Sequence, residues 1–95
     1  MMKTEYQNKV ILNLKRLREI NEFSQSKVAL FLGISNGQIG NIETPTSPHK
    51  YTLAQIAKLC KKFKVPIELV FYGNGVDASK ISKEELLKKI IEYQN

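Results

Sequence analysis

Residues 23–43, FSQSKVALFLGISNGQIGNIE, limit the possible folds more than any other part of this chain. Ser24 is a favourable N-cap, and the small Ala29 lies where a neighbouring helix can approach closely. Gly33 follows the first apolar stretch directly, and glycine tolerates the left-handed conformation in which many helices end. Ser35 is a second favourable N-cap. The segment therefore predicts two short helices joined by one tight turn at Gly33.

The second of these helices is expected to have an apolar side and a polar side. Ile39 and Ile42 are three residues apart, so both are predicted to point into the core. The outward side is expected to hold Asn36, Gly37, Gln38, Gly40 and Asn41. Two helices joined in this way form a helix-turn-helix, a motif that places its second helix in the major groove of DNA.

Apolar residues at helical spacing predict four further helices. Three begin at pairs with capping-box spacing, which are Thr4 with Gln7, Thr52 with Gln55, and Ser82 with Glu85. The fourth is short and opens at Val65-Pro66, because proline suits a first helical turn. The apolar face of the first helix is predicted to be Val10, Ile11, Leu14, Leu17 and Ile20, and that of the last helix Ile81, Leu86, Leu87, Ile90 and Ile91.

This pattern predicts an all-α protein with two parts. Five helices form a domain over residues 1–72, and residues 73–95 add a hinge and a C-terminal amphipathic helix. The segment Gly73-Asn74-Gly75 is the predicted turn between them. A helix of this length is marginal in water by itself. We therefore expect it to pack on the domain or on a second copy of the chain, as a homodimer.

Positive charge is concentrated in the segment that contains the predicted motif. The formal net charge is +6, and residues 9–64 hold ten Lys or Arg against three acids, whereas residues 65–95 hold four Lys against five acids. A basic domain suits a polyanion, because binding releases condensed counterions. The alternative interpretation is a lysine-rich surface that only keeps a small protein soluble.

Other classes of protein and site are not expected. No apolar run approaches the roughly 20 residues of a membrane span, and the first residues lack the apolar block of a signal peptide, so we expect a cytoplasmic protein. Cys60 is the single cysteine and His49 the single histidine, which excludes an internal disulfide and disfavours zinc. Without a Gly-rich phosphate loop or a cluster at ligand spacing, we expect no enzyme activity, cofactor, metal or small-molecule ligand.

Three stretches in register resemble one protein family. QSKVA is followed by GISNGQIGNIE and then by LxxIAKLCKKFKVPIE. Their order is similar to the helix-turn-helix domain of phage repressors, the Cro/repressor or Xre-like family, and the resemblance covers about residues 8–71. It implies a repressor-like five-helix fold and binding to double-stranded DNA.

The resemblance also implies roles for matching positions. The recognition helix corresponds to residues 35–43, and its base-facing or nearby positions fall on Ser35, Asn36, Gly37, Gln38 and Asn41. Asn and Gln side chains pair with adenine N6 and N7 in the major groove. Gln25 is similar to a glutamine that touches a phosphate, and Lys27 and Lys50 are placed to reach the DNA backbone. Arg18 and Glu43 match an ion pair that holds the first helix to the end of the recognition helix.

Each polar position also has a structural interpretation. Asn36 and Asn41 are compatible with plain solvent exposure, and Gln38 with capping Ser35. His49 is equally compatible with a solvated loop. Arg18 and Glu43 fit a structural role better than contact with DNA.

Two features depart from the family pattern. Gly37 and Gly40 each cost a helix about 1 kcal/mol relative to alanine, which predicts either fraying without DNA or close backbone approach to the groove. Residues 28–49 contain no Lys or Arg, so contacts from arginine to guanine are absent from this helix. We therefore expect a binding site rich in A·T.

The sequence as a whole favours a sequence-specific DNA-binding transcriptional regulator, and a repressor in particular. The alternative is a protein-interaction module with the same fold, such as an antitoxin or an adaptor. The operator, the regulating signal and the choice between repression and activation are not determined by these residues.

Overall fold

The secondary structure of the computed structural model, which describes residues 2–95, is entirely helical. In chain order the helices are α1 (Glu5–Ile20), α2 (Gln25–Leu32), α3 (Asn36–Glu43), α4 (Leu53–Phe63), α5 (Ile67–Tyr72), the 3₁₀ helix η1 (Ala78–Lys80) and α6 (Lys83–Gln94). No strand occurs in this range. The predicted all-α class is confirmed, and η1 is an element that the sequence did not predict.

The helices begin at the capping residues that the sequence indicated. Reciprocal capping boxes are formed by Thr4 with Gln7, Ser35 with Gln38, Thr52 with Gln55, and Ser82 with Glu85. Gly33 ends α2 in the left-handed conformation, with a φ of 73°. The sequence predicted that Pro66 lies in the first turn of α5. In the structure it is the N-cap residue and precedes the helix.

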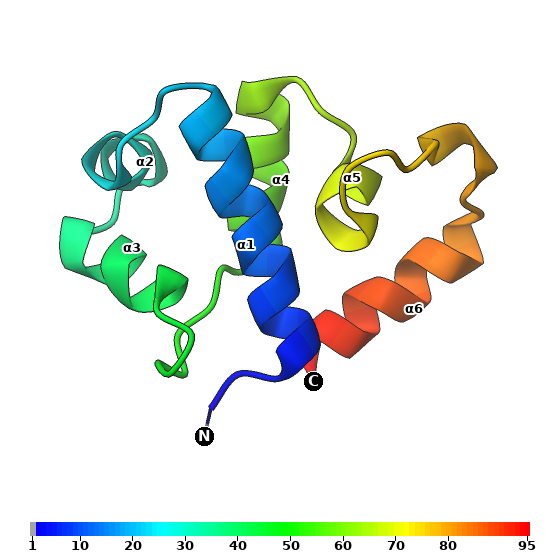
Figure 1. Cartoon of the computed structure of the whole chain (residues 1–95), viewed down its shortest axis with the longest axis horizontal. Coiled ribbons are helices and arrows are strands. Elements are labelled where there is room, and N and C mark those ends of the chain that lie inside the picture. The colour runs from blue at the N-terminus through cyan, green and yellow to red at the C-terminus, as the bar shows by residue number, and fades with distance from the viewer. Residues whose placement is uncertain (1) are drawn as a thin grey trace.

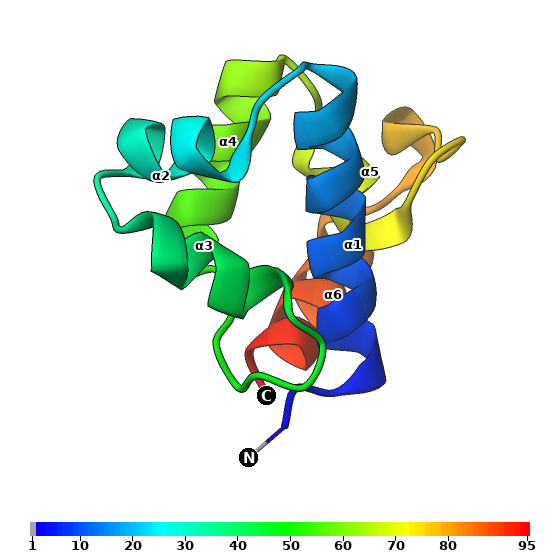
Figure 2. The ribbon, with the colours of Figure 1, turned by 60° about the vertical axis from the view of Figure 1, so that its left-hand side comes forward.

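Helix α1 runs through the middle of the molecule and separates two groups of helices. Helices α2 and α3 lie on one side of α1, and α5 and α6 lie on the other (Figure 1). Helix α4 passes behind α1 in that view, and a rotation by 60° shows α2 and α3 crossing in front of α4 (Figure 2). Within residues 2–95, no helix combines the length and apolar character needed to cross a bilayer.

All six α-helices contribute side chains to one hydrophobic core. Its buried members include Val10, Leu14, Val28, Ile39, Ile56, Leu59, Val70, Phe71 and Tyr93. The predicted apolar face of α1 is buried as far as Leu17. Ile20 is exposed, so the expectation for this residue was wrong: it is the last residue of α1 and lies outside the core.

Helix α6 packs against the rest of the same chain through the half-buried Leu86 and Ile90 and through Tyr93, a buried residue that the sequence analysis did not select. Tyr93 is buried, its ring meets Phe71 edge-on at 5.8 Å, and its hydroxyl donates to the Tyr51 carbonyl at 2.7 Å. Leu87 and Ile91 were predicted to share the apolar face of the helix, but they are 56% and 54% exposed. Helix α6 therefore has a buried side and a second, exposed apolar side.

Candidate functional site

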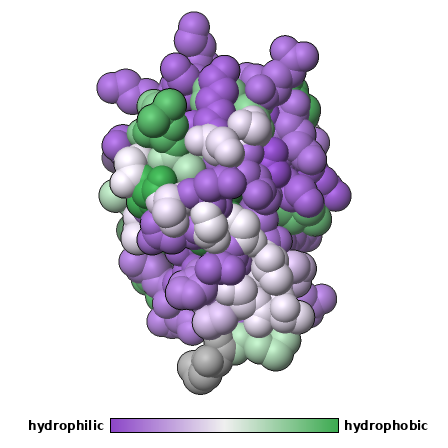
Figure 3. Space-filling model, turned by 90° about the vertical axis from the view of Figure 1, so that its left-hand side faces the viewer, coloured by the Kyte–Doolittle hydropathy of each residue, from purple (hydrophilic) through white to green (hydrophobic). Residues whose placement is uncertain are grey.

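Helix α3 is held with its polar side in solvent. Ile39 is completely buried and Ile42 nearly so, as expected from their spacing. The predicted site residues Ser35, Asn36, Gly37, Gln38 and Asn41 are all exposed. Figure 3 views the molecule from the side on which α2 and α3 lie, and that face is mostly hydrophilic.

The turn between α2 and α3 fixes the angle at which α3 is presented. Ile34 donates its N–H to the Ala29 carbonyl at 3.0 Å, across the left-handed Gly33. Val28 and Ala29 are buried on the inner side of α2. The carbonyl groups at the end of α2 are thus satisfied while the chain reverses into α3.

A three-residue clamp, formed by Arg18, Gln25 and Glu43, holds the end of α3. Arg18 Nε donates to Glu43 Oε2 at 2.6 Å, and Arg18 Nη2 donates to Glu43 Oε1 at 2.7 Å. Gln25 Nε2 donates to the same Oε1 atom at 2.9 Å. The clamp therefore connects α1, the start of α2 and the end of α3. Bidentate pairs of this kind fix geometry as well as charge.

Burial and hydrogen bonding act in opposite directions on Glu43. Burial would raise the pKa of this carboxyl group, but the hydrogen bonds from Arg18 and Gln25 hold the pKa below its usual value. The Glu43 side chain is only 4% exposed. Since the carboxylate is ionised and paired, the clamp stays formed at neutral pH.

Lys3 is a site residue that the sequence analysis missed. Its ammonium group is buried and donates to the carbonyl groups of Ile42 at 2.7 Å, Thr44 at 3.1 Å and His49 at 2.6 Å. Burial lowers the pKa of Lys3. This contact caps the end of α3 and closes the loop that follows. No helical periodicity leads to Lys3, because it precedes the first helix.

The structure assigns the Gln38 side chain to the start of α3. Its Oε1 accepts the Ser35 N–H at 2.8 Å, and Ser35 Oγ accepts the Gln38 N–H at 3.2 Å. The carbonyl end of this amide is therefore engaged within the helix. The side chains of Asn36 and Asn41 are exposed and form no hydrogen bond within residues 2–95, so their amides are free for a ligand.

In the sequence, Lys27 precedes α3 and Lys50 follows it. The Lys27 ammonium is 4.2 Å from the centre of the Phe23 ring. The Lys50 ammonium donates to the carbonyl groups of Tyr93 and Gln94, which places it at the end of α6. Lys50 thus satisfies carbonyl groups at a helix C-terminus, a structural contact that the sequence did not indicate.

A hollow of about 230 Å³ adjoins α3. Its lining includes Gln38, Asn41, His49, Lys50 and Gln55. Four residues that the sequence singled out therefore lie around one hollow: Gln38 and Asn41 of α3, and His49 and Lys50 of the loop after it. Gln25 and Lys27 lie outside this lining, on α2.

The two glycines of α3 are not required by packing. A methyl group placed on Gly37 would meet nothing within 4 Å, and one placed on Gly40 would lie 3.8 Å from Gln25 Oε1, an ordinary contact distance. Both residues have helical backbone angles, which alanine also adopts. Gly37 leaves the exposed backbone at the start of α3 uncovered, whereas Gly40, which was expected to face outward, is half-buried beside Gln25.

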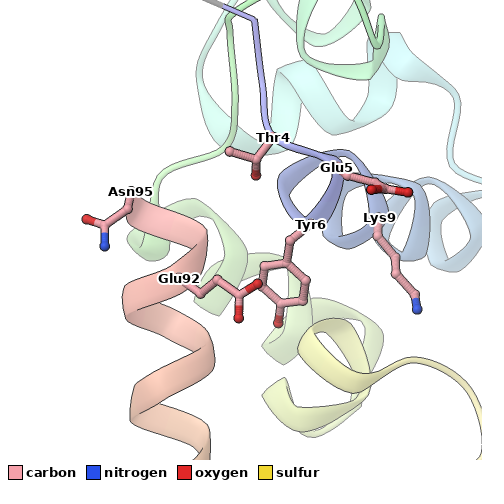
Figure 4. A pocket seen from close by; sticks show the side chains of 6 residues that line it. All are labelled: Thr4, Glu5, Tyr6, Lys9, Glu92 and Asn95. Carbon is pink, nitrogen blue, oxygen red and sulfur yellow. The ribbon is translucent and has the colours of Figure 1, made fainter.

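The largest hollow lies away from α3, between the start of α1 and the end of α6. It measures about 600 Å³ and is lined by Thr4, Glu5, Tyr6, Lys9, Glu92 and Asn95 (Figure 4). The Tyr6 hydroxyl donates to the Phe71 carbonyl at 2.8 Å. Burial, with the nearby Glu92 and Tyr72, raises the pKa of Tyr6 to about 12. In residues 2–95, no group of three or more His, Cys, Asp or Glu is placed to hold a metal ion.

Comparison with protein-family models gives no match for this chain. Comparison with curated proteins gives no match either. The arrangement of residues around α3 is therefore the feature of this chain that bears on its function.

Proposed function

We propose that this chain is a sequence-specific regulator of transcription that binds double-stranded DNA, and specifically a repressor of the phage-repressor type acting in the cytoplasm. Helix α3 enters the major groove. One observation carries the proposal. Helix α3 exposes the unpaired amides of Asn36 and Asn41, while its inner side is buried in the core and its C-terminal end is held by the clamp. A helix-turn-helix recognition helix needs that combination.

The spacing of the free amides along α3 suits base pairs that lie about two steps apart. Asn36 and Asn41 are five residues apart, which is about 7.5 Å along a helix axis. That length corresponds to roughly two base-pair steps of 3.4 Å. Asparagine pairs with adenine through N6 and N7, and no Lys or Arg occurs in residues 28–49. The proposed operator is therefore rich in A·T where α3 contacts it.

Phosphate contacts are assigned to the start of α2. Because the Gln25 side-chain amide donates to Glu43, the main-chain N–H groups of Gln25 and Ser26 are the donors available for a phosphate oxygen. Lys27 adds positive charge on the same turn. These contacts fix the position of the protein on DNA and carry no sequence information themselves.

A homodimer is part of this proposal. Leu87 and Ile91 are exposed one helical turn apart on α6, away from the side that holds Tyr93. Pairing this surface with a second copy would remove it from water. A dimer would place two α3 helices on half-sites about one turn of DNA, ~34 Å, apart.

A second candidate is a protein-interaction module, such as an antitoxin or adaptor. Neither candidate function includes catalytic activity. The absence of Lys and Arg from residues 28–49 favours it, because the outward side of α3 is polar but uncharged. The two candidates differ in their response to salt. Affinity for DNA that falls steeply between two salt concentrations supports the regulator, since phosphate contacts release counterions. Binding to duplex DNA that is weak and independent of sequence supports the interaction module.

A further inference from the structure

A surface formed by α2 and α4 combines an exposed leucine with aromatic rings and lysines. Leu30 is 84% exposed. Leu30 and Phe31 follow Lys27 by three and four residues, so each of them is a neighbour of Lys27 on the surface of α2. We call this surface the lysine–aromatic patch, and its members are Phe23, Lys27, Leu30, Phe31, Lys58 and Lys62.

The lysines of the patch are held over the aromatic rings. The Lys62 ammonium lies 5.9 Å from the centre of the Phe23 ring and 5.5 Å from that of Phe31. The Lys58 ammonium is 5.8 Å from the Phe31 ring centre, and Lys27 approaches Phe23 more closely. Cations and rings therefore alternate across the surface, from α2 to α4. Contacts of this kind orient the ammonium groups without neutralising their charge.

The positive charge of the patch has no acidic partner among the residues that the structure describes. In residues 2–95 the ion pairs are Arg18 with Glu43 and Lys89 with Glu92, and neither includes a residue of the patch. Figure 3 shows an apolar area surrounded by hydrophilic residues on the side where α2 and α3 lie. The patch thus presents three cations without an acidic partner among the described residues, next to two half-buried aromatic rings and to an exposed leucine on the same helix as Lys27.

We propose that the lysine–aromatic patch binds an acidic protein segment that carries an apolar anchor residue. Carboxylates of the segment pair with Lys27, Lys58 and Lys62, and its anchor covers Leu30 and the exposed edge of Phe31. Opposite charge gives such a contact its specificity and its rate of association, and the covered leucine contributes to affinity. The surface is separate from the outward side of α3, but it shares Lys27 with the phosphate contacts proposed at the start of α2.

Charge and polarity decide against two other occupants. A second copy of the chain docked by a two-fold axis would place these lysines against identical lysines, which repel. Nucleic acid would satisfy the lysines through phosphates but would leave Leu30 in contact with a polar backbone. An acidic segment with an apolar anchor matches both features of the surface.

The test uses the whole chain and a synthetic helical peptide that has glutamates on one side and two leucines one turn apart. Backbone amide NMR signals identify the residues that the peptide contacts, and fluorescence anisotropy gives the affinity. We expect signals of the patch to shift. Leu30→Ala and the double variant Lys58→Glu/Lys62→Glu are each expected to weaken binding about tenfold. The matched controls, Leu12→Ala on α1 and Lys88→Glu on α6, are expected to change it less than about twofold.

Three comparisons make the result decisive. A peptide with serine in place of both leucines, and a peptide with lysine in place of the glutamates, are each expected to lose binding. Equal binding by the serine peptide would overturn the proposal, because charge alone would then explain the contact. No binding by the first peptide, shifts mapped to another surface, or stronger shifts of the Lys58 and Lys62 signals with duplex DNA would also overturn it. Circular dichroism verifies that each variant is folded.

Discussion

Arg18 and Glu43 are joined by two parallel hydrogen bonds that fix the end of α3 to α1. Both side chains are largely buried, with 12% and 4% exposure. Gln25 adds a third hydrogen bond from the start of α2. The orientation of the exposed polar side of α3 therefore depends on a contact that lies behind it.

Breaking this contact from one side is expected to destabilise the fold. Arg18→Met leaves the Glu43 carboxylate buried without its cation, and a loss of about 3 kcal/mol in the free energy of unfolding is expected. Urea denaturation measures the change. The double variant Arg18→Met/Glu43→Leu is the matched comparison, because it removes both charges and should recover much of the loss. A single variant as stable as the unchanged protein would contradict this role.

The same clamp predicts a dependence of stability on pH. The pKa of Glu43 is lower in the folded state than in the unfolded chain. Its contribution is therefore fully present above the unfolded value, about 4.3, and is lost as pH falls through the folded value. Unfolding free energies measured from neutral pH downward should decline less steeply below about pH 4 in Arg18→Met/Glu43→Leu than in the unchanged protein. Parallel curves would show that Glu43 is not the group responsible.

Lys3 is expected to hold the loop after α3. Lys3→Met keeps the length of the side chain but removes one donor from three carbonyl groups, of which only that of Thr44 keeps another, the Ser47 N–H. We therefore expect a loss of about 1–3 kcal/mol in unfolding free energy. Amide hydrogen exchange should become faster in residues 44–50. Lys9→Met, at an exposed position of α1, is the control and should leave both quantities unchanged. Unaltered exchange in the first variant would contradict the role of Lys3.

The glycines of α3 allow stability to be separated from binding. Gly37→Ala should stabilise the fold by about 0.5–1 kcal/mol, because the site is helical and open. If α3 approaches DNA through its uncovered backbone, the same variant should bind its operator more weakly. Gly75→Ala is the control for the stability measurement. It is expected to lower stability, because Gly75 has a φ of 85° that alanine rarely adopts. Stability gained without any loss of affinity would show that the backbone at Gly37 does not approach the DNA.

Substitutions on the two sides of α6 are expected to have different effects, because Tyr93 is buried whereas Leu87 and Ile91 are exposed. Tyr93→Ala should cost about 3–5 kcal/mol in unfolding free energy, because it removes a buried ring. Truncation after Tyr72 should weaken operator binding and should also lower stability for the same reason.

Leu87→Ser/Ile91→Ser should leave stability nearly unchanged but reduce dimer formation, as measured by sedimentation. An unchanged mass in solution would contradict the proposed dimer surface.

The helices could be predicted from the sequence because their signals are local. Capping pairs such as Ser35 with Gln38, and the left-handed Gly33, act within a few residues and formed as expected. The burial of Ile39 and Ile42 followed from their spacing.

Contacts between distant segments could not be predicted in the same way. Lys3 reaches carbonyl groups about forty residues further along the chain, and no local pattern reports that distance. Lys50 is bound at the end of α6 for the same reason. Tyr93 was detectable, since it lies three residues after Ile90 and seven after Leu86, on the side of α6 that packs inward.

Selection of a random duplex library on the purified protein tests the central claim most directly. We predict a short palindromic motif rich in A·T, and a loss of about 1–3 kcal/mol in binding free energy for Asn36→Ala and for Asn41→Ala. Selection of no motif, a motif with a G·C-rich centre, or an affinity unchanged in both variants would contradict the placement of α3 in the major groove.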